Sequence, residues 1–378
     1  MKGKRKTIAV KASPRRRSAT RYGRGASDPG PRRDFQGYGA HPPHARWPGD
    51  ARIAVNLNLN VEAGGERCIL EGDAASEHVL TDIGFPPYAN TRSPMVESVF
   101  EYGPRVGCWR LLRIFRKFDV KVSILGVVRG LQQYPQLVNA FVEAGHEIVS
   151  HGWRWLDYHQ IAEREERDHI RAAFVGIEAL TGVAPVGWFN GRPSIRTRRL
   201  VIEHGGFLYD RDYLGDELPF WVSHDARHHL VIPFSFETND NRFDQNSAFS
   251  TAEDFATYLK DCFDLLYEEG AEIPNVMTIS LHDRLIGRPA KAVGLIKFLE
   301  HARRHDRIWF CTGKDIAEHW YRTHPPKISG LTPAMNQTRE SAPRPYLHCL
   351  KSGSNIAVNF FPSAEFGSTW SRPPITFS

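Results

Sequence analysis

Short apolar runs alternate with longer segments of helical periodicity along most of the chain. Between residues 106 and 118, for example, Trp109, Leu112 and Phe115 recur at the spacing of one helix face. The same criteria predict strands over residues 52–59, 120–126, 146–150, 183–188, 230–234, 276–281 and 307–311, and helices over 106–118, 135–144, 161–180, 196–204, 252–269, 290–304 and 316–321. This alternation is typical of a parallel sheet covered by helices. About seven strands suit an α/β protein built as a (β/α) barrel, and an open doubly wound sheet is the alternative.

Two stretches without such periodicity flank this region. Residues 1–33 hold twelve Lys or Arg and a single Asp, although the net charge of the whole 378-residue chain is only +6. We expect a disordered basic tail over 1–32, one barrel domain over 33–325 and a second disordered tail over 326–378. Because the basic tail lacks interleaved aromatic residues, we expect no nucleic-acid partner.

The cysteine pattern and the length of the apolar runs bear on the cellular compartment of the protein. The five cysteines are odd in number and form no C-x-x-C pair, which argues against a disulfide framework and a cysteine zinc site. No apolar run approaches the roughly 18 residues of a membrane-spanning helix, and no apolar segment follows the basic start as it would in a signal peptide. We therefore expect a cytoplasmic protein without a membrane segment, and we leave a homo-oligomer open.

Polar side chains gather where the predicted strands end. The clusters are Asn60 with Glu62, His151 with Asp157, Arg192 after Gly191, and His282 with Arg284. A lone histidine in such a place is more often a hydrogen-bonded core residue, but the strand ends of a barrel open on one face, so four clusters favour a shared site. There Glu62 or one histidine would activate water, and the other histidine would protonate a leaving nitrogen.

The order of these residues resembles the motifs of the polysaccharide deacetylase superfamily, also called carbohydrate esterase family four, over about residues 33–325. Several longer stretches are similar to one branch of it, the allantoinases of urate degradation. These stretches are Gly37-Tyr38-Gly39 with Pro42-Pro43-His44, Gly64-Gly65-Glu66-Arg67-Cys68, Ser150-His151-Gly152-Trp153-Arg154-Trp155, Pro219-Phe220-Trp221, Thr238-Asn239-Asp240 and Leu285-Ile286-Gly287-Arg288-Pro289. The resemblance implies a distorted barrel of about seven β/α units.

The chain departs from the sugar deacetylases of that superfamily at the metal site. Those enzymes place two consecutive aspartates at the first strand end and a second histidine four residues after the first. Here these positions read Asn60-Val61 and Trp155. Because zinc needs about three firm protein ligands, we expect no metal ligands and no cofactor, with a divalent metal such as zinc as the less favoured alternative.

These observations predict a hydrolase of carbon–nitrogen bonds other than peptide bonds. The expected reaction is ring-opening of allantoin or a related cyclic ureide or imide, with this small molecule as the partner. One alternative is N-deacetylation of chitooligosaccharides or other polysaccharides, and another is a degenerate barrel that binds without catalysis. The predicted catalytic residues are Glu62, His151 and His282, and the predicted substrate-binding residues are Asn60, Trp155, Arg192, Asp240 and Arg284.

Overall fold

The central strand β1 (Ile53–Val61) shows how the sequence pattern produces the fold. Successive side chains of a strand point to opposite faces, and in β1 apolar residues alternate with asparagines. Val55, Leu57 and the other apolar residues belong to the main hydrophobic core. On the other face, Asn58 Oδ1 accepts a hydrogen bond of 2.7 Å from Arg211 Nη1, and Asn56 binds the same guanidinium group. The interior of the sheet's curve is therefore polar, and its outside is apolar.

The computed structural model describes residues 30–83, 86, 88–244 and 248–326, all within one compact unit. The other strands are β2 (Ser123–Gly126), β3 (Glu147–Ser150), β4 (Gly187–Trp188), β5 (Tyr209–Asp210), β6 (Phe220–His224), β7 (Arg227–Val231), β8 (Asn275–His282) and β9 (Ile308–Phe310). The helices are α1 (Pro94–Tyr102), α2 (Cys108–Lys117), α3 (Val128–Leu131), α4 (Pro135–Glu143), α5 (Glu163–Thr181), α6 (Thr197–His204), α7 (Ala252–Glu269), α8 (Pro289–Ala302) and α9 (Gly313–Thr323).

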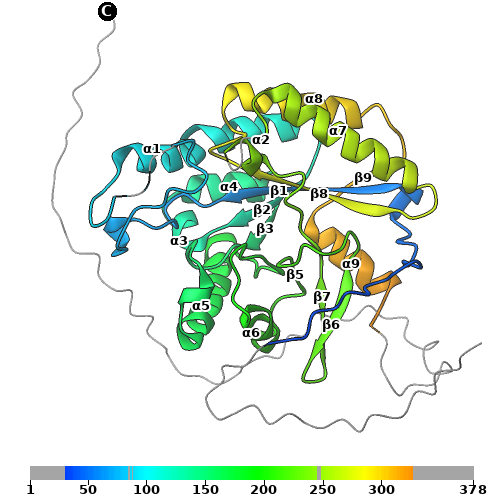
Figure 1. The fold of residues 1–378 in the computed structure, drawn as a ribbon, viewed down its shortest axis with the longest axis horizontal. Helices are drawn as coiled ribbons and strands as arrows, with labels where there is room; N and C mark the ends of the chain where they lie inside the picture. The colour runs from blue at the N-terminus through cyan, green and yellow to red at the C-terminus, as the bar shows by residue number, and fades with distance from the viewer. Residues whose placement is uncertain (1–29, 84–85, 87, 245–247, 327–378) are drawn as a thin grey trace, which may run out of the picture. The chain divides into compact units, whose positions relative to one another are not determined.

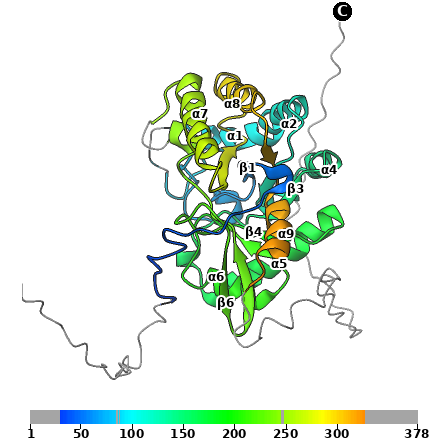
Figure 2. The same ribbon diagram turned by 90° about the vertical axis from the view of Figure 1, so that its right-hand side faces the viewer.

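The strands form one curled sheet. Its order is β6-β7-β5-β4-β3-β2-β1-β8, and β9 pairs with the first half of β1. Every pairing is parallel except the β6–β7 hairpin, which projects from the lower part of the molecule in Figures 1 and 2. Beyond β7, Asn239 forms a parallel bridge with Ser280 of β8, and Ser280 N donates to Thr238 O at 3.0 Å. This contact joins the segment after β7 to β8, so the curled sheet forms a distorted barrel.

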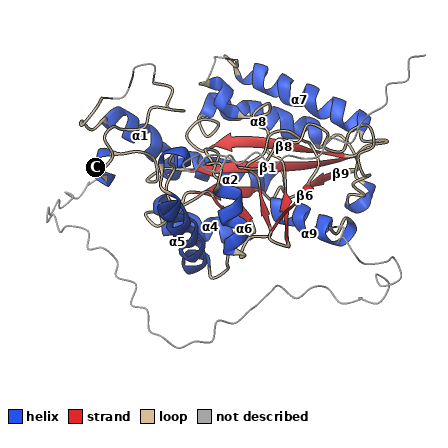
Figure 3. Cartoon of the chain, turned by 60° about the horizontal axis from the view of Figure 1, so that its bottom comes forward, coloured by secondary structure: helices blue, strands red, loops and turns tan. Residues whose placement is uncertain are grey.

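Helices cover the outside of the sheet (Figure 3). In Figure 1, α7 and α8 lie on one side of β1 and β8, and α5 and α6 lie on the opposite side. Two of the helices begin with complete capping boxes, in which Thr251 and Asp254 start α7 and Thr312 and Asp315 start α9. The bounds of α7 agree with the prediction because this cap and its apolar face are both explicit in the sequence.

The structure confirms the predicted α/β barrel and contains all seven predicted strands. It also contains elements that the pattern did not predict, namely the short strand β5, the hairpin strand β6, the helix α1 and the one-turn helix α3. β5 is only two residues long, and β6 is only partly buried, so neither produces a clear apolar signal. The predicted tails 1–32 and 326–378 lie almost wholly outside the described residues.

Candidate functional site

The carboxyl ends of three strands bring the predicted catalytic residues together. Glu62 follows the last residue of β1, His151 follows β3, and His282 is the last residue of β8. The register places Asn60 directly opposite His282 across the β1–β8 pair. In parallel α/β folds this edge of the sheet is where active sites form. All four of these residues are buried, with at most 5% of their surface exposed.

His151 is held between two acceptors. Its Nδ1 lies 3.2 Å from Phe189 O, and its Nε2 lies 3.2 Å from Glu62 Oε1. A carbonyl oxygen accepts hydrogen bonds and never donates them, and the same holds for an ionised carboxylate. Phe189 O accepts from Nδ1 and an ionised Glu62 accepts from Nε2, so each ring nitrogen faces an acceptor and Nε2 is placed to donate.

His282 has the opposite arrangement. Its Nδ1 donates to Asp240 Oδ1 at 2.6 Å, and the other oxygen of Asp240 accepts from the backbone N–H groups of His282 (2.8 Å) and Ile286 (3.1 Å). A carboxylate on Nδ1 fixes the ring orientation and the tautomer. The Nε2 of His282 is then the available base, and it lies 3.9 Å from Glu62 Oε1.

Glu62 stands between the two histidines and a buried arginine. Arg284 Nη1 lies 2.6 Å from Glu62 Oε2, and its side chain has no exposed surface. Burial alone would raise the pKa of Glu62, but the charge of the Arg284 guanidinium and the hydrogen bond from His151 hold that pKa well below its usual range. Glu62 therefore stays ionised, and a carboxylate with a lowered pKa is a weak base.

A pocket of about 340 Å³ opens over these residues. Phe189 and Phe234 stack at 4.4 Å in its wall. The guanidinium of Arg192 lies 3.9 Å from the ring centre of Trp155, and Arg192 Nη1 lies 3.1 Å from the buried Glu77 Oε2. The lining residues are Asn60, Glu62, Arg67, Val79, Leu80, His151, Trp155, Asp157, Phe189, Gly191, Arg192, Phe234, Phe236, Asn239, Asn241, Ser280 and His282. The pocket therefore combines aromatic walls with two guanidinium groups.

The predicted substrate-binding residues fall into two groups. Asn60, Trp155 and Arg192 line the pocket. The amide nitrogen of Asn60 donates to Ser280 Oγ and Leu281 O, both at 2.9 Å, so only its Oδ1 is left for a substrate. Asp240 and Arg284 are fully buried and do not line the pocket. A substrate-binding role does not fit these two positions, because Asp240 holds His282 and Arg284 holds Glu62.

Several residues that line the pocket are not among the site residues predicted from the sequence. Arg67 lines it, and no side-chain hydrogen bond or ion pair of Arg67 is found within the described part of the chain. Its signal was the stretch Gly64-Gly65-Glu66-Arg67-Cys68, which follows Glu62 closely in the sequence. Asn239 and Asn241 reach the pocket only because the segment after β7 pairs with β8. That long-range pairing leaves no signal in the hydrophobic pattern, although Asn239 belongs to the stretch Thr238-Asn239-Asp240 that resembles the allantoinases.

Comparisons with known proteins agree with this geometry. The sequence profile described as polysaccharide deacetylase matches residues 88–200. A Schizosaccharomyces pombe protein, named as a polysaccharide deacetylase, is 36% identical over 315 residues, which cover 78% of this chain and 98% of that protein. No helix in residues 30–326, within the parts that the structure describes, is long and apolar enough to span a membrane.

Two solved structures are similar in both sequence and fold. A probable polysaccharide deacetylase from Pseudomonas aeruginosa PAO1 is 49% identical, with a TM-score of 0.77, and the match covers 78% of this chain and 99% of that one. PuuE allantoinase is 48% identical, also with a TM-score of 0.77, and the match covers 80% and 100%. These likenesses confirm the predicted allantoinase-like resemblance and the predicted class, hydrolases of carbon–nitrogen bonds. The chain belongs to the polysaccharide deacetylase family.

Proposed function

We propose that this enzyme opens the ring of allantoin or a related cyclic ureide or imide by hydrolysis. The observation that carries the proposal is the pair of histidines beside Glu62, whose Nε2 atoms have different surroundings. His282 offers a free Nε2, and His151 offers a proton on Nε2. A base and an acid within one small pocket are what hydrolysis of an acyl–nitrogen bond needs.

In the proposed reaction, His282 Nε2 takes a proton from water as the water oxygen attacks the ring carbonyl carbon. Asp240 stabilises the imidazolium that forms, through its 2.6 Å contact with Nδ1. The proton shared between His151 Nε2 and Glu62 passes to the leaving nitrogen as the C–N bond breaks. The water oxygen remains on the carbon as a carboxylic acid, whose proton, the second one from the water, passes to solvent and leaves a carboxylate. His282 then releases its extra proton to solvent and His151 takes one up, which restores both histidines.

The pocket suits a small polar ring better than a sugar chain. Its volume of about 340 Å³ is near the lower limit of small-molecule sites, which span roughly 300–1,000 Å³. Arg67 and Arg192 supply donors for ureide carbonyl oxygens and for the product carboxylate. The similarity to an allantoinase of known structure also favours this substrate class. Deacetylation of a polysaccharide is the second candidate, favoured by the names of the other two relatives.

We further propose that the reaction needs no metal ion. A cation bound at Glu62 would face the guanidinium of Arg284, which already lies 2.6 Å from Glu62 Oε2 and is fully buried. Water does not screen two positive charges at such a place. Arg284 therefore supplies the positive charge that a metal would bring, and the residues of this pocket do not fit a divalent ion. A reducing, cytoplasmic location agrees with Cys68, Cys108, Cys262 and Cys311, which are all free.

A substrate panel tests the proposal. Purified enzyme would be incubated with allantoin, hydantoin, succinimide and chitooligosaccharides, each with and without EDTA, with the His282→Asn variant as the inactive control. We expect ring-opening of a cyclic ureide or imide at an unchanged rate in EDTA. Acetate release from chitooligosaccharides that stops with EDTA would identify a metal-dependent deacetylase instead. An intact protein without turnover on any of these compounds would favour a binding module.

A further inference from the structure

The outer helices α7 and α8 carry a cluster of potential metal ligands that does not line the candidate active site. Asp264 lies on α7, His301 on α8, and His305 in the turn that follows α8. One ligand atom from each residue lies within 4.8 Å of the other two. Among the described residues, no other set of three His, Cys, Asp or Glu side chains has its ligand atoms within this distance of one another.

The ring of His305 is already oriented as a metal-binding histidine would be. Its Nδ1 donates to the backbone oxygen of His301 at 3.2 Å, which leaves the Nε2 lone pair free. Histidines that bind metals usually donate their other nitrogen to a carbonyl or a carboxylate in this way. Phe263 and Tyr267, both on α7, pack against the ring, with centroid distances of 5.1 Å. The orientation of His305 is therefore fixed by α7 as well as by its own backbone.

His301 and Asp264 provide the other two ligand atoms. His301 Nε2 lies 2.6 Å from Asp264 Oδ1. The ring centroids of His301 and His305 are 4.9 Å apart. Tetrahedral zinc with bonds of about 2.0–2.1 Å places its ligand atoms about 3.3 Å apart. Only small movements are needed to reach that spacing, and the half-exposed side chain of Asp264 is free to make them.

We propose that Asp264, His301 and His305 bind a divalent transition metal, with Zn²⁺ as the best match. Two imidazole nitrogens and one carboxylate oxygen form a ligand set that zinc prefers, and solvent completes the fourth position. The ion links α7 to the end of α8. These two helices flank β8 in the chain, and β8 ends in His282. The bound metal stabilises this layer and takes no part in the proposed hydrolysis.

Zinc binding to the full chain tests this site without any activity assay. EDTA-treated protein would be dialysed against micromolar Zn²⁺ and analysed for metal content, and its Tm would be measured with and without zinc. We expect about one zinc per chain and a rise in Tm of roughly 2–6 °C at a hundredfold excess over Kd. A tetrahedral visible spectrum with Co²⁺ is a second readout.

Two variants and a matched control locate the metal. His305→Gln and Asp264→Asn should abolish both the zinc content and the Tm rise, while melting like the wild type in EDTA. His159→Gln should retain both, because His159 forms a similar surface pair with Asp157, at 3.4 Å, without belonging to a group of three. Absence of zinc from the wild type, or zinc retained by His305→Gln, would overturn the proposal. Neither result depends on the identity of the substrate.

Discussion

His146 and His151 flank the same short strand, β3, yet their surroundings differ completely. His146 precedes the strand and packs edge to face against Phe115, with ring centres 5.8 Å apart. Burial, aided by the charge of Lys121, lowers the pKa of His146 to about 4. His151 follows the strand and lies between Phe189 O and the Glu62 carboxylate. Burial therefore favours the neutral form of His146, whereas both ring nitrogens of His151 face hydrogen-bond acceptors.

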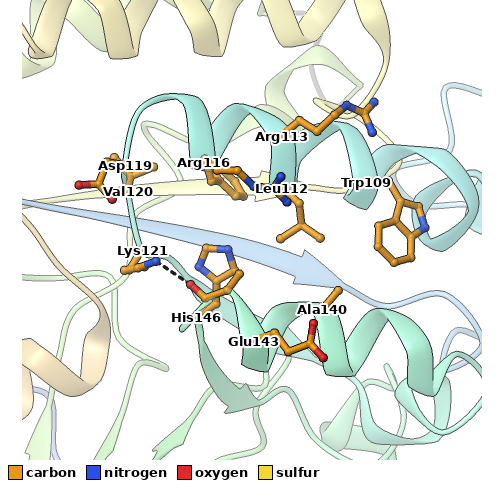
Figure 4. Close-up of a pocket in the computed structure, with 12 residues that line it drawn as sticks. Trp109, Leu112, Arg113, Arg116, Asp119, Val120, Lys121, Ala140, Glu143 and His146 are labelled. Atoms are coloured by element: carbon orange, nitrogen blue, oxygen red, sulfur yellow. Dashed lines mark hydrogen bonds between the residues drawn. The ribbon is translucent and has the colours of Figure 1, made fainter.

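The cavities beside the two histidines show that size does not identify the active site. Figure 4 shows the groove at His146, between α2 with Trp109 and Arg113 and α4 with Ala140 and Glu143. Its volume is about 560 Å³, compared with about 340 Å³ at His151. In the groove, Lys121 Nζ donates to a backbone oxygen. Chemistry is expected in the smaller pocket, because three strand ends bring His151, His282 and the Glu62 carboxylate together there.

The largest expected effect comes from removing either histidine of the pocket. His151→Asn and His282→Asn keep part of the volume and hydrogen bonding but lose the proton donor and the base. A general acid or base contributes roughly 10²–10⁴ in rate, so kcat on the identified substrate should fall at least about a hundredfold. Tm should stay close to that of the wild type. Near-normal kcat in a folded variant would remove that histidine from the mechanism, and loss by unfolding alone would make its role structural.

The next effect concerns the buried ion pair between Arg284 and Glu62, the carboxylate that His151 contacts. Arg284→Met leaves the Glu62 carboxylate buried without its 2.6 Å partner. Breaking a buried pair in this way costs about 3–5 kcal/mol of unfolding free energy. Adding Glu62→Gln should restore part of the stability but no activity, and urea denaturation of both variants measures this. If Arg284→Met alone unfolds like the wild type, Arg284 does not stabilise the buried Glu62 carboxylate.

The comparison also shows which parts of the site could be predicted from the sequence. Glu62, His151 and His282 could be named because each follows or ends an apolar strand, and parallel strands open on one edge. The role of Asp240 could not be predicted, because its contact with His282 Nδ1 depends on the bridge between Asn239 and Ser280. Local pattern predicts strand ends, whereas the partner of each side chain depends on tertiary contacts.

The same limit applies to the fold. The capped helix α7 and the apolar strands β1 and β8 were predicted nearly to the residue. The helix α1 was missed because only Val96 and Phe100 are buried, while Met95 is 65% exposed. A single buried turn produces too weak a periodicity to be recognised. Its position depends on the close packing of Gly103 against Asp283, which no local pattern indicates.

A smaller effect is expected from Glu66, which lies close to Arg284 and Glu62. Burial raises the pKa of Glu66 from 4.5 to about 7. A raised folded-state pKa contributes stability that is complete below pH 4.5 and is lost as pH rises through 7, on the order of 3 kcal/mol. Glu66→Gln should therefore flatten the pH dependence of the unfolding free energy between pH 5 and 8. Urea denaturation across this range checks it, with the exposed Glu101→Gln as control, and an unchanged slope would contradict it.

The smallest effect is expected at His146, where the comparison predicts a change in stability without a change in chemistry. In the wild type, the Val122 N–H group donates to His146 Nδ1 at 3.3 Å. An asparagine in place of His146 keeps an acceptor for this N–H group but loses the ring contact with Phe115. We expect His146→Asn to cost about 1–2 kcal/mol at pH 8 and to leave kcat per folded molecule unchanged. Because the folded-state pKa is lowered from 6.5 to about 4, the stability that His146 contributes is present above pH 6.5 and is lost as pH falls, by about 2 kcal/mol at pH 5. The difference between wild type and variant should therefore shrink or reverse at pH 5. A hundredfold loss of kcat in the folded variant would show that the histidine before β3 also takes part in the reaction.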